Sequence, residues 1–235
     1  MNQEHNHIVQ SYDEEQQRLG EEIQRMGAMA IAQLEAALDA VERRDDQLAR
    51  HVIANDAAID RLEEDISQGV MKLALRGPLA SDLRVILAAL RIAAAIERAG
   101  DYAANLAKRA LVLNTYLPMP QIPALRQLGL RVAGQMRDVL RAYAALDAEA
   151  AQQVRERDAE IDTLHTRLFH EITQYMTQDA RHIQPCTHLL FMAKNLERIG
   201  DHATNIAEHI WYRARPATPL SPREKRDRSS ELAPR

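Results

Sequence analysis

Apolar side chains recur every three or four residues along most of the chain, which is the spacing of a buried helix face. Polar, proline-containing and glycine-containing turns interrupt this pattern. The pattern predicts six helices, at 8–42, 47–75, 82–115, 122–145, 149–177 and 185–214. The first apolar stripe consists of Ile23, Met26, Ala30, Leu34, Ala37 and Val41, and the second of Val52, Ile59, Leu62, Ile66, Val70 and Leu73.

The pattern occurs twice. Adding 102 to each position of the first two stripes gives two further stripes of apolar residues. These are Leu125, Leu128, Val132, Met136, Val139 and Tyr143, then Val154, Ile161, Leu164, Leu168, Ile172 and Tyr175. Two acids are repeated in the same register, because Asp56 and Asp60 return as Asp158 and Asp162. Such a repeat indicates a duplicated three-helix unit.

The third helix of each unit contains the most similar segment. Residues 97–105 read Glu-Arg-Ala-Gly-Asp-Tyr-Ala-Ala-Asn, and residues 197–205 read Glu-Arg-Ile-Gly-Asp-His-Ala-Thr-Asn. Long helices must bury their apolar faces against one another. We therefore predict an all-α fold of two tandem antiparallel three-helix bundles, at 1–117 and 118–214. Residues 215–235 contain proline, serine and charge without apolar periodicity, and we predict a disordered tail there.

Turn signals set the boundaries. Gly77-Pro78 separates the second predicted helix from the third, and Ser81 is a candidate N-cap. The prolines at 118, 120 and 123 end the first unit. In the second unit a hairpin is expected near Asp147, and Pro185 suits the first turn of the last helix.

Composition narrows the class of protein. Hydrophobic residues make up 46% and charged residues 27%, and no apolar run is long enough for a transmembrane helix. The net charge of −4 argues against nucleic acid as a partner. The polar first residues do not resemble a signal peptide, and Cys186 is the single cysteine. We therefore expect a cytoplasmic protein.

An acidic stripe is repeated on the third helix of each unit. Its members are spaced i, i+4 and i+8 on one helix face. They are Glu97, Asp101 and Asn105 in the first unit and Glu197, Asp201 and Asn205 in the second. Carboxylates among apolar neighbours need a cation. Oxygen donors suit hard divalent or iron-type metal ions, and the stripe does not discriminate among Mg, Mn, Fe and Zn.

Other interpretations of these residues stay open. Arg98, Arg198 or Lys108 would neutralise the acids in a metal-free protein. The acids at 56, 60, 158 and 162 are either ordinary surface acids or further ligands. Gly100 and Gly200 either allow a neighbouring helix to approach or leave room for metal.

The repeated Glu-Arg-x-Gly-Asp-x-Ala-x-Asn motif, over about residues 10–213, resembles the PhoU family of phosphate-uptake regulators. The resemblance implies a two-repeat helical bundle that binds multinuclear metal at Glu/Asp-x-x-x-Asp motifs and often forms dimers. It makes the two acidic stripes the candidate metal sites, and no catalytic residue is implied. The second motif departs from the first at Ile199, His202 and Thr204, so the two sites need not hold metal equally.

The same resemblance implies a regulatory function. PhoU-like proteins act with the phosphate ABC transporter and a sensor histidine kinase, and they restrain uptake and the starvation response when phosphate is plentiful. The implied partners are the transporter's ATPase subunit and the kinase's PAS domain. Contact with the membrane is then expected only through these partners.

Two alternatives to such an adaptor are a metal-free helical scaffold and a di-metal carboxylate enzyme. Enzymes of the second class carry Glu-x-x-His pairs on facing helices. Within the two repeats, Asp162-Thr163-Leu164-His165 is the nearest pattern, and Glu63 stands at the position that matches His165. We therefore expect no enzymatic activity.

Overall fold

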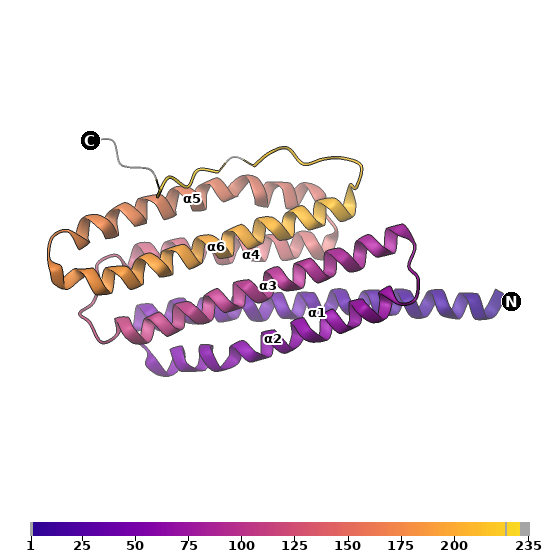
Figure 1. Ribbon diagram of the computed structural model, residues 1–235, viewed down its shortest axis with the longest axis horizontal. Coiled ribbons are helices and arrows are strands. Elements are labelled where there is room, and N and C mark those ends of the chain that lie inside the picture. The colour runs from indigo at the N-terminus through magenta and orange to yellow at the C-terminus, as the bar shows by residue number, and fades with distance from the viewer. Residues whose placement is uncertain (1, 224, 231–235) are drawn as a thin grey trace.

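Six long helices and one short 3-10 helix make up the computed structural model, which describes residues 2–223 and 225–230, and side chains from Tyr12 onward (Figure 1). The helices are α1 (Asn2–Arg43), α2 (Asp46–Ala74), α3 (Ala80–Leu113), α4 (Ile122–Ala145), α5 (Ala148–Met176), η1 (Ala180–His182) and α6 (Ile183–Ala214). The described residues include no strand. The prediction of an all-α fold is confirmed.

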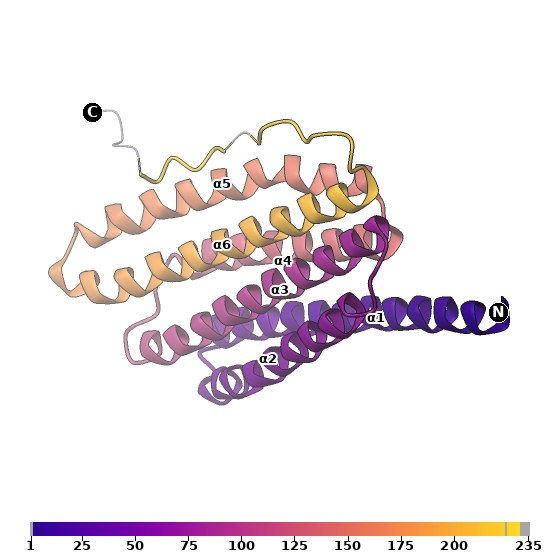
Figure 2. The same cartoon turned by 45° about the vertical axis from the view of Figure 1, so that its right-hand side comes forward.

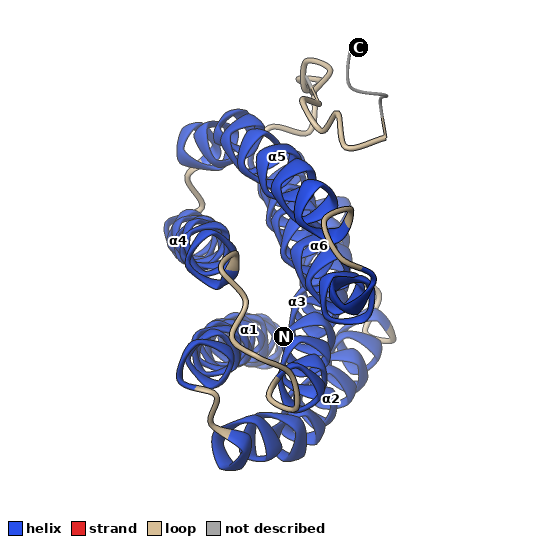
Figure 3. Ribbon diagram, turned by 90° about the vertical axis from the view of Figure 1, so that its left-hand side faces the viewer, coloured by secondary structure: helices blue, strands red, loops and turns tan. Residues whose placement is uncertain are grey.

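The helices form two three-helix units that lie side by side. α1, α2 and α3 pack on one another, as do α4, α5 and α6. The units meet where α3 packs on α6 and α1 packs on α4 (Figure 3). The two helices that carry the repeated motif therefore lie next to each other at the centre of the molecule, where Tyr102 and His202, which are repeat equivalents, place their ring centroids 5.8 Å apart.

The repeated apolar stripes form the core. Every residue of the first stripe on α1 is buried, and so is every counterpart on α4. The stripes on α2 and α5 are buried too, except that Leu62, Leu164 and Tyr175 are partly exposed at the edge of the core. Burial of these apolar faces, more than helix propensity, stabilises helices of this length.

Two glycines bring α1 and α4 close together in a reciprocal contact. A Cβ built on Gly27 would lie 2.7 Å from Leu140 Cδ2, and one built on Gly129 would lie 2.5 Å from Leu38 Cδ2. Gly129 and Leu140 are the repeat counterparts of Gly27 and Leu38. A leucine of each unit therefore packs against the equivalent glycine of the other unit.

The boundaries differ from the prediction in a few places. α1 begins at Asn2, several residues earlier than predicted. The prediction of Ser81 as an N-cap is wrong: the cap is Leu79, without a side-chain hydrogen bond, and Ser81 already lies in α3. Pro185 lies in the first turn of α6, as predicted, and the short helix η1 before it was not foreseen.

The segment after α6 has no helix or strand in its described residues, and the prediction that 215–235 is disordered stays a prediction. Its described residues, 215–223 and 225–230, run back along α5 and α6 (Figure 2). Their contacts are hydrogen bonds and ion pairs to α5 and α6, which an apolar periodicity cannot reveal. No helix in the described part of the chain combines the length and the apolar character needed to cross a membrane.

The two hairpins that lead into α2 and α5 have the same construction. Arg44 and Leu146 both adopt left-handed backbone conformations, with φ of 57° and 51°. The next residue caps the helix: Asp45 accepts a hydrogen bond from Leu48 N and Asp147 accepts one from Ala150 N, both at 2.9 Å.

Replacing these caps should destabilise the fold. We expect Asp45→Ala and Asp147→Ala each to lower the free energy of unfolding by about 1 kcal/mol, because each leaves a helix N-terminal N–H group without its partner. Urea denaturation followed by circular dichroism measures the effect. Glu64→Ala, which removes an exposed acid from the middle of α2, is the control. Equal stability of the cap variants and this control would contradict the capping role.

Candidate metal centre

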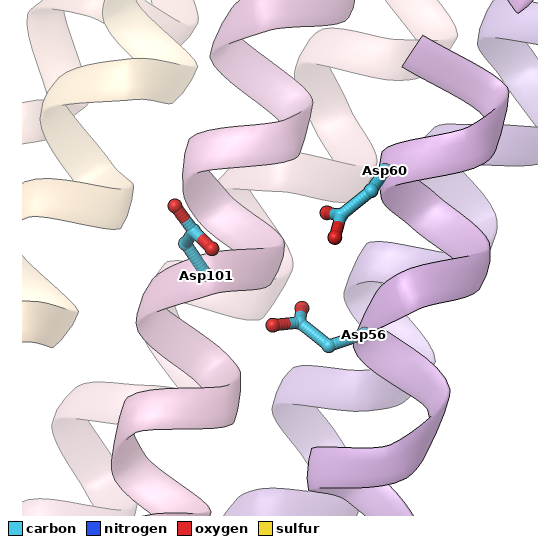
Figure 4. A group of neighbouring side chains, drawn as sticks. All are labelled: Asp56, Asp60 and Asp101. Atoms are coloured by element: carbon cyan, nitrogen blue, oxygen red, sulfur yellow. The ribbon is translucent and has the colours of Figure 1, made fainter. Parts of the chain in front are cut away.

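Three carboxylates meet between α2 and α3. Asp56 and Asp60 lie one turn apart on α2 and point toward α3, which carries Asp101 (Figure 4). One oxygen of each carboxylate lies within 4.8 Å of the others. The structure therefore brings one predicted ligand, Asp101, together with the two acids of α2.

A glutamine of α1 orients this group. Gln33 Nε2 donates to Asp56 Oδ1 at 2.8 Å and to the Gly100 carbonyl oxygen at 3.1 Å. Gln33 is 7% exposed. Gln33 was not among the predicted site residues, although an amide inside an apolar stripe that returns as Gln135 was an available signal.

The glycine of the motif permits close approach of α2. A Cβ on Gly100 would lie 3.0 Å from Ile59 Cδ1 and 3.7 Å from Asp56 Oδ1. In the second unit, a Cβ on Gly200 would lie 3.2 Å from Gln135 Oε1 and 3.4 Å from Asp158 Oδ1. These contacts support the interpretation that the glycines allow a neighbouring helix to approach, whereas the interpretation that they leave room for metal stays a prediction.

The first site is short of positive charge. Burial raises the pKa of Asp56, and the neighbouring charges of Asp60 and Asp101 raise it further, against the hydrogen bond from Gln33. Burial and the charge of Asp101 likewise raise the pKa of Glu97. Clustered carboxylates with raised pKa values favour a cation that neutralises them together.

Arg98 partly supplies that charge. Its Nη1 lies 3.0 Å from Asp101 Oδ2, and its Nε lies 3.4 Å from Glu97 Oε2. Its side chain is 59% exposed, so these ion pairs are weak. Within the described residues, no cation lies within ion-pair distance of Asp56 or Asp60.

The second unit holds the repeat counterparts of these acids, and they are more deeply buried. Among the described residues, three carboxylates come within 4.8 Å of one another only in the first unit. Asp158, Asp162 and Glu197 are 2%, 3% and 6% exposed. Gln135 Nε2 donates to Asp158 Oδ1 at 3.1 Å, as Gln33 does to Asp56. Burial raises the pKa of Asp158, whereas Gln135 and Arg223 of the tail oppose that shift.

The asparagines of the predicted stripes make no hydrogen bond to the acids in the described structure. Asn105 is half-buried and Asn205 is exposed. Asn205 shares a surface hollow with Asp201 and His202. The assignment of Glu97, Asp101, Asn105, Glu197, Asp201 and Asn205 as metal ligands remains a prediction.

The donor set fits a hard metal ion. Asp56, Asp60, Asp101 and Glu97 offer only carboxylate oxygens in the first site, and Asp158, Asp162, Asp201 and Glu197 do so in the second. Two buried acceptors of the second unit, Glu197 Oε2 and Gln135 Oε1, have no hydrogen-bond partner among the described atoms. Unsatisfied buried oxygens of this kind favour a cation.

Comparison with known proteins agrees with the duplicated architecture. The PhoU domain family model matches the chain twice, at residues 23–110 and 125–210. A protein of Xylella fastidiosa (strain 9a5c) named phosphate-specific transport system accessory protein PhoU homolog is 58% identical over 233 residues, 99% of both chains. A protein of the same name from Rhizobium meliloti (strain 1021) is 44% identical over 230 residues, 97% of both chains.

Solved structures agree as well. PhoU from Pseudomonas aeruginosa has a TM-score of 0.85 and 31% identity, and the match covers 88% of this chain and all of that one. The phosphate transport system regulatory protein PhoU from Streptococcus pneumoniae has a TM-score of 0.82 and 28% identity, covering 89% of this chain and all of that one. With two family matches that together span most of its length, this chain belongs to the PhoU family.

Proposed function

We propose that this protein is a negative regulator of phosphate uptake and of the phosphate-starvation response. The observation that carries the proposal is its 58% identity, over 99% of both chains, to a relative named as an accessory protein of the phosphate-specific transport system. The name of the Streptococcus pneumoniae structure, a phosphate transport system regulatory protein, supports the same role.

The acidic sites give this regulator a metal-binding capacity. Asp56, Asp60, Asp101 and Glu97 hold the metal in the first site, and Gln33 fixes the orientation of Asp56 through its hydrogen bond. A bound ion supplies positive charge that links α2 to α3. The proposed role of the carboxylates is thus to join the two helices in a defined arrangement, which a partner protein recognises.

The proposed partners are the ATPase subunit of the phosphate ABC transporter and the PAS domain of the sensor histidine kinase. The protein acts as an adaptor between them, as a homodimer on the cytoplasmic side of the membrane. An accessory role in transport requires binding and not turnover. Consistent with this, none of the acids of either site stands in a Glu-x-x-His pair.

One observation favours the metal-free scaffold as a second candidate. Arg98 already pairs with Asp101 and Glu97, as that alternative requires. The two candidates differ in what they demand of Asp101 and Asp201. A metal-dependent regulator needs both carboxylates, whereas a scaffold keeps its function with alanine at these positions.

A starvation reporter tests the regulatory role. In the source organism without this gene, grown in high phosphate, we expect alkaline phosphatase activity to rise several-fold, because the restraint is lost. The intact gene, or a gene that carries the Glu64→Ala control, should restore low alkaline phosphatase activity. Reporter activity that stays low without the gene would contradict the proposed function.

The same strain separates the two candidates. A gene that carries Asp101→Ala with Asp201→Ala should fail to silence the reporter if the metal sites are required. Full silencing by this variant, at equal protein level, would favour the metal-free scaffold.

A further inference from the structure

The tail after α6 places a cation between two acids of the second site. The Arg223 guanidinium lies with Nη1 3.2 Å from Asp158 Oδ2, and its Nη2 donates to Asp201 Oδ1. Lys225 Nζ lies 3.5 Å from the same Asp201 oxygen. The Arg223 side chain is only 14% exposed, so this contact is well shielded from water.

Further contacts hold the tail in this position. Trp211 Nε1 donates to the Thr218 carbonyl oxygen at 2.8 Å, and the buried Arg155 donates through Nη2 to the Ser221 carbonyl oxygen at 2.7 Å. Beyond Arg223, the Arg226 backbone N–H donates to Asp162 Oδ2 at 2.7 Å. The tail thus touches three of the four acids of the second site.

The first site has no such occupant. Asp158, Asp162 and Asp201 are the repeat counterparts of Asp56, Asp60 and Asp101, whose oxygens form the compact group between α2 and α3. The tail lies over α5 and α6 and not over α2 and α3 (Figures 1 and 2). The two acid sets therefore differ in the presence of a basic segment of the chain itself, as well as in their burial and in how closely their carboxylates gather.

The tail satisfies the second site incompletely. Glu197 Oε2 and Gln135 Oε1, both in residues more than nine-tenths buried, have no hydrogen-bond partner among the described atoms. Gln135 belongs to the site because its amide nitrogen donates to Asp158. A guanidinium is planar and reaches its partners from one side, whereas a divalent ion gathers six or more oxygens around itself.

We propose that Arg223 and Lys225 act as a built-in cation that occupies the second acidic site until a divalent metal ion displaces it, so that metal binding there releases the tail from α5 and α6. This inference rests on the metal-binding role proposed above. The first site then binds metal against the exposed Arg98 but without competition from the tail, whereas the second binds it against the tail as well as Lys194.

Manganese titration of the full chain tests the competition. Asp56→Asn with Asp60→Asn removes the first site, so that calorimetry with Mn²⁺ reports on the second. In this background we expect Arg223→Gln to lower the dissociation constant for Mn²⁺ about tenfold, the change expected from loss of one shielded ion pair. Arg18→Gln, which removes the same charge from an exposed position on α1, should leave the constant unchanged.

Release of the tail has its own measurements. Trp211 is the single tryptophan and hydrogen-bonds to the tail, so its fluorescence should change when Mn²⁺ saturates the second site. Trypsin should then cleave several times faster after Lys225, a site that Arg223→Gln leaves intact. Both responses should be much smaller in Arg223→Gln, in which the tail is already loosened.

The possible outcomes distinguish displacement of the tail by metal from the metal site itself. If Mn²⁺ binds to the wild-type chain but Arg223→Gln changes neither its affinity nor the cleavage rate, the inference is overturned and the proposed metal site stands. If Mn²⁺ binds to neither wild type nor Arg223→Gln, the inference and the metal-binding part of the proposed function both fall.

Discussion

Asp101→Ala combined with Asp201→Ala should strip metal from the protein while the helices stay folded. Each substitution removes a carboxylate that belongs to one of the two acidic sites. Loss of an orienting group around a metal typically costs tenfold to hundredfold in affinity, so loss of a ligand should cost at least about a hundredfold. Elemental analysis after dialysis against metal-free buffer measures the effect.

The fold should survive because neither residue is part of the core. The side chains of Asp101 and Asp201 are 35% and 31% exposed, and alanine has the higher helix propensity. Far-ultraviolet circular dichroism provides this check, and Asp138→Ala, at a partly buried acid of α4 outside both sites, is the matched control. Unchanged metal content in a folded double variant would remove Asp101 and Asp201 from the list of ligands.

Gly129→Val should be among the most destabilising substitutions in the chain. Its Cβ alone would lie 2.5 Å from Leu38 Cδ2, and valine adds two more methyl groups to the contact between α1 and α4. Overpacking of this kind costs roughly 1–3 kcal/mol, and at the upper end of that range the melting temperature should fall by roughly 5–10 °C. Thermal denaturation compares the variant with Gly134→Val on the same helix, where an added Cβ meets nothing within 4 Å.

A second substitution tests the cause. Leu38→Ala alone should cost about 2–5 kcal/mol, because it leaves a cavity beside Gly129. Combined with Gly129→Val, the valine fills part of that cavity, so the double variant should be more stable than the sum of the two changes predicts by about 1 kcal/mol. If the free-energy changes of Leu38→Ala and Gly129→Val add strictly, or if Gly134→Val destabilises the protein equally, the reciprocal contact is not the cause of the destabilisation.

The architecture could be predicted from the sequence because it depends on a strong signal. Residues such as Ile23 and Leu125 recur at helical spacing, in register, over two units, and nearly all of them are buried. Helix ends were less certain: Ser81 has the chemistry of a cap, but the chain enters α3 two residues earlier. The preference of a residue for the cap position does not by itself decide a boundary, since α3 begins without a side-chain cap.

The site was predicted only in part. Asp101 was identified from the motif, whereas its grouping with Asp56 and Asp60 depends on how α2 lies against α3, which a single stripe does not contain. Gln33 was passed over because polar residues inside an apolar stripe carry no local signature of their partner. The acidic partner of Arg223 could not be identified for a related reason, since its contacts lie in α5 and α6 and the tail itself has no pattern.

The chain has two acid sets but only one tail, and this ratio follows from the joining of the two units in one polypeptide. Separate, identical units paired through the same reciprocal contact would each carry a tail, and both sites would be covered or both would be free. In the joined chain the C-terminus exists once. The presence of one tail for two acid sets is therefore enough to make the two sites different, whether the protein is a monomer or a dimer.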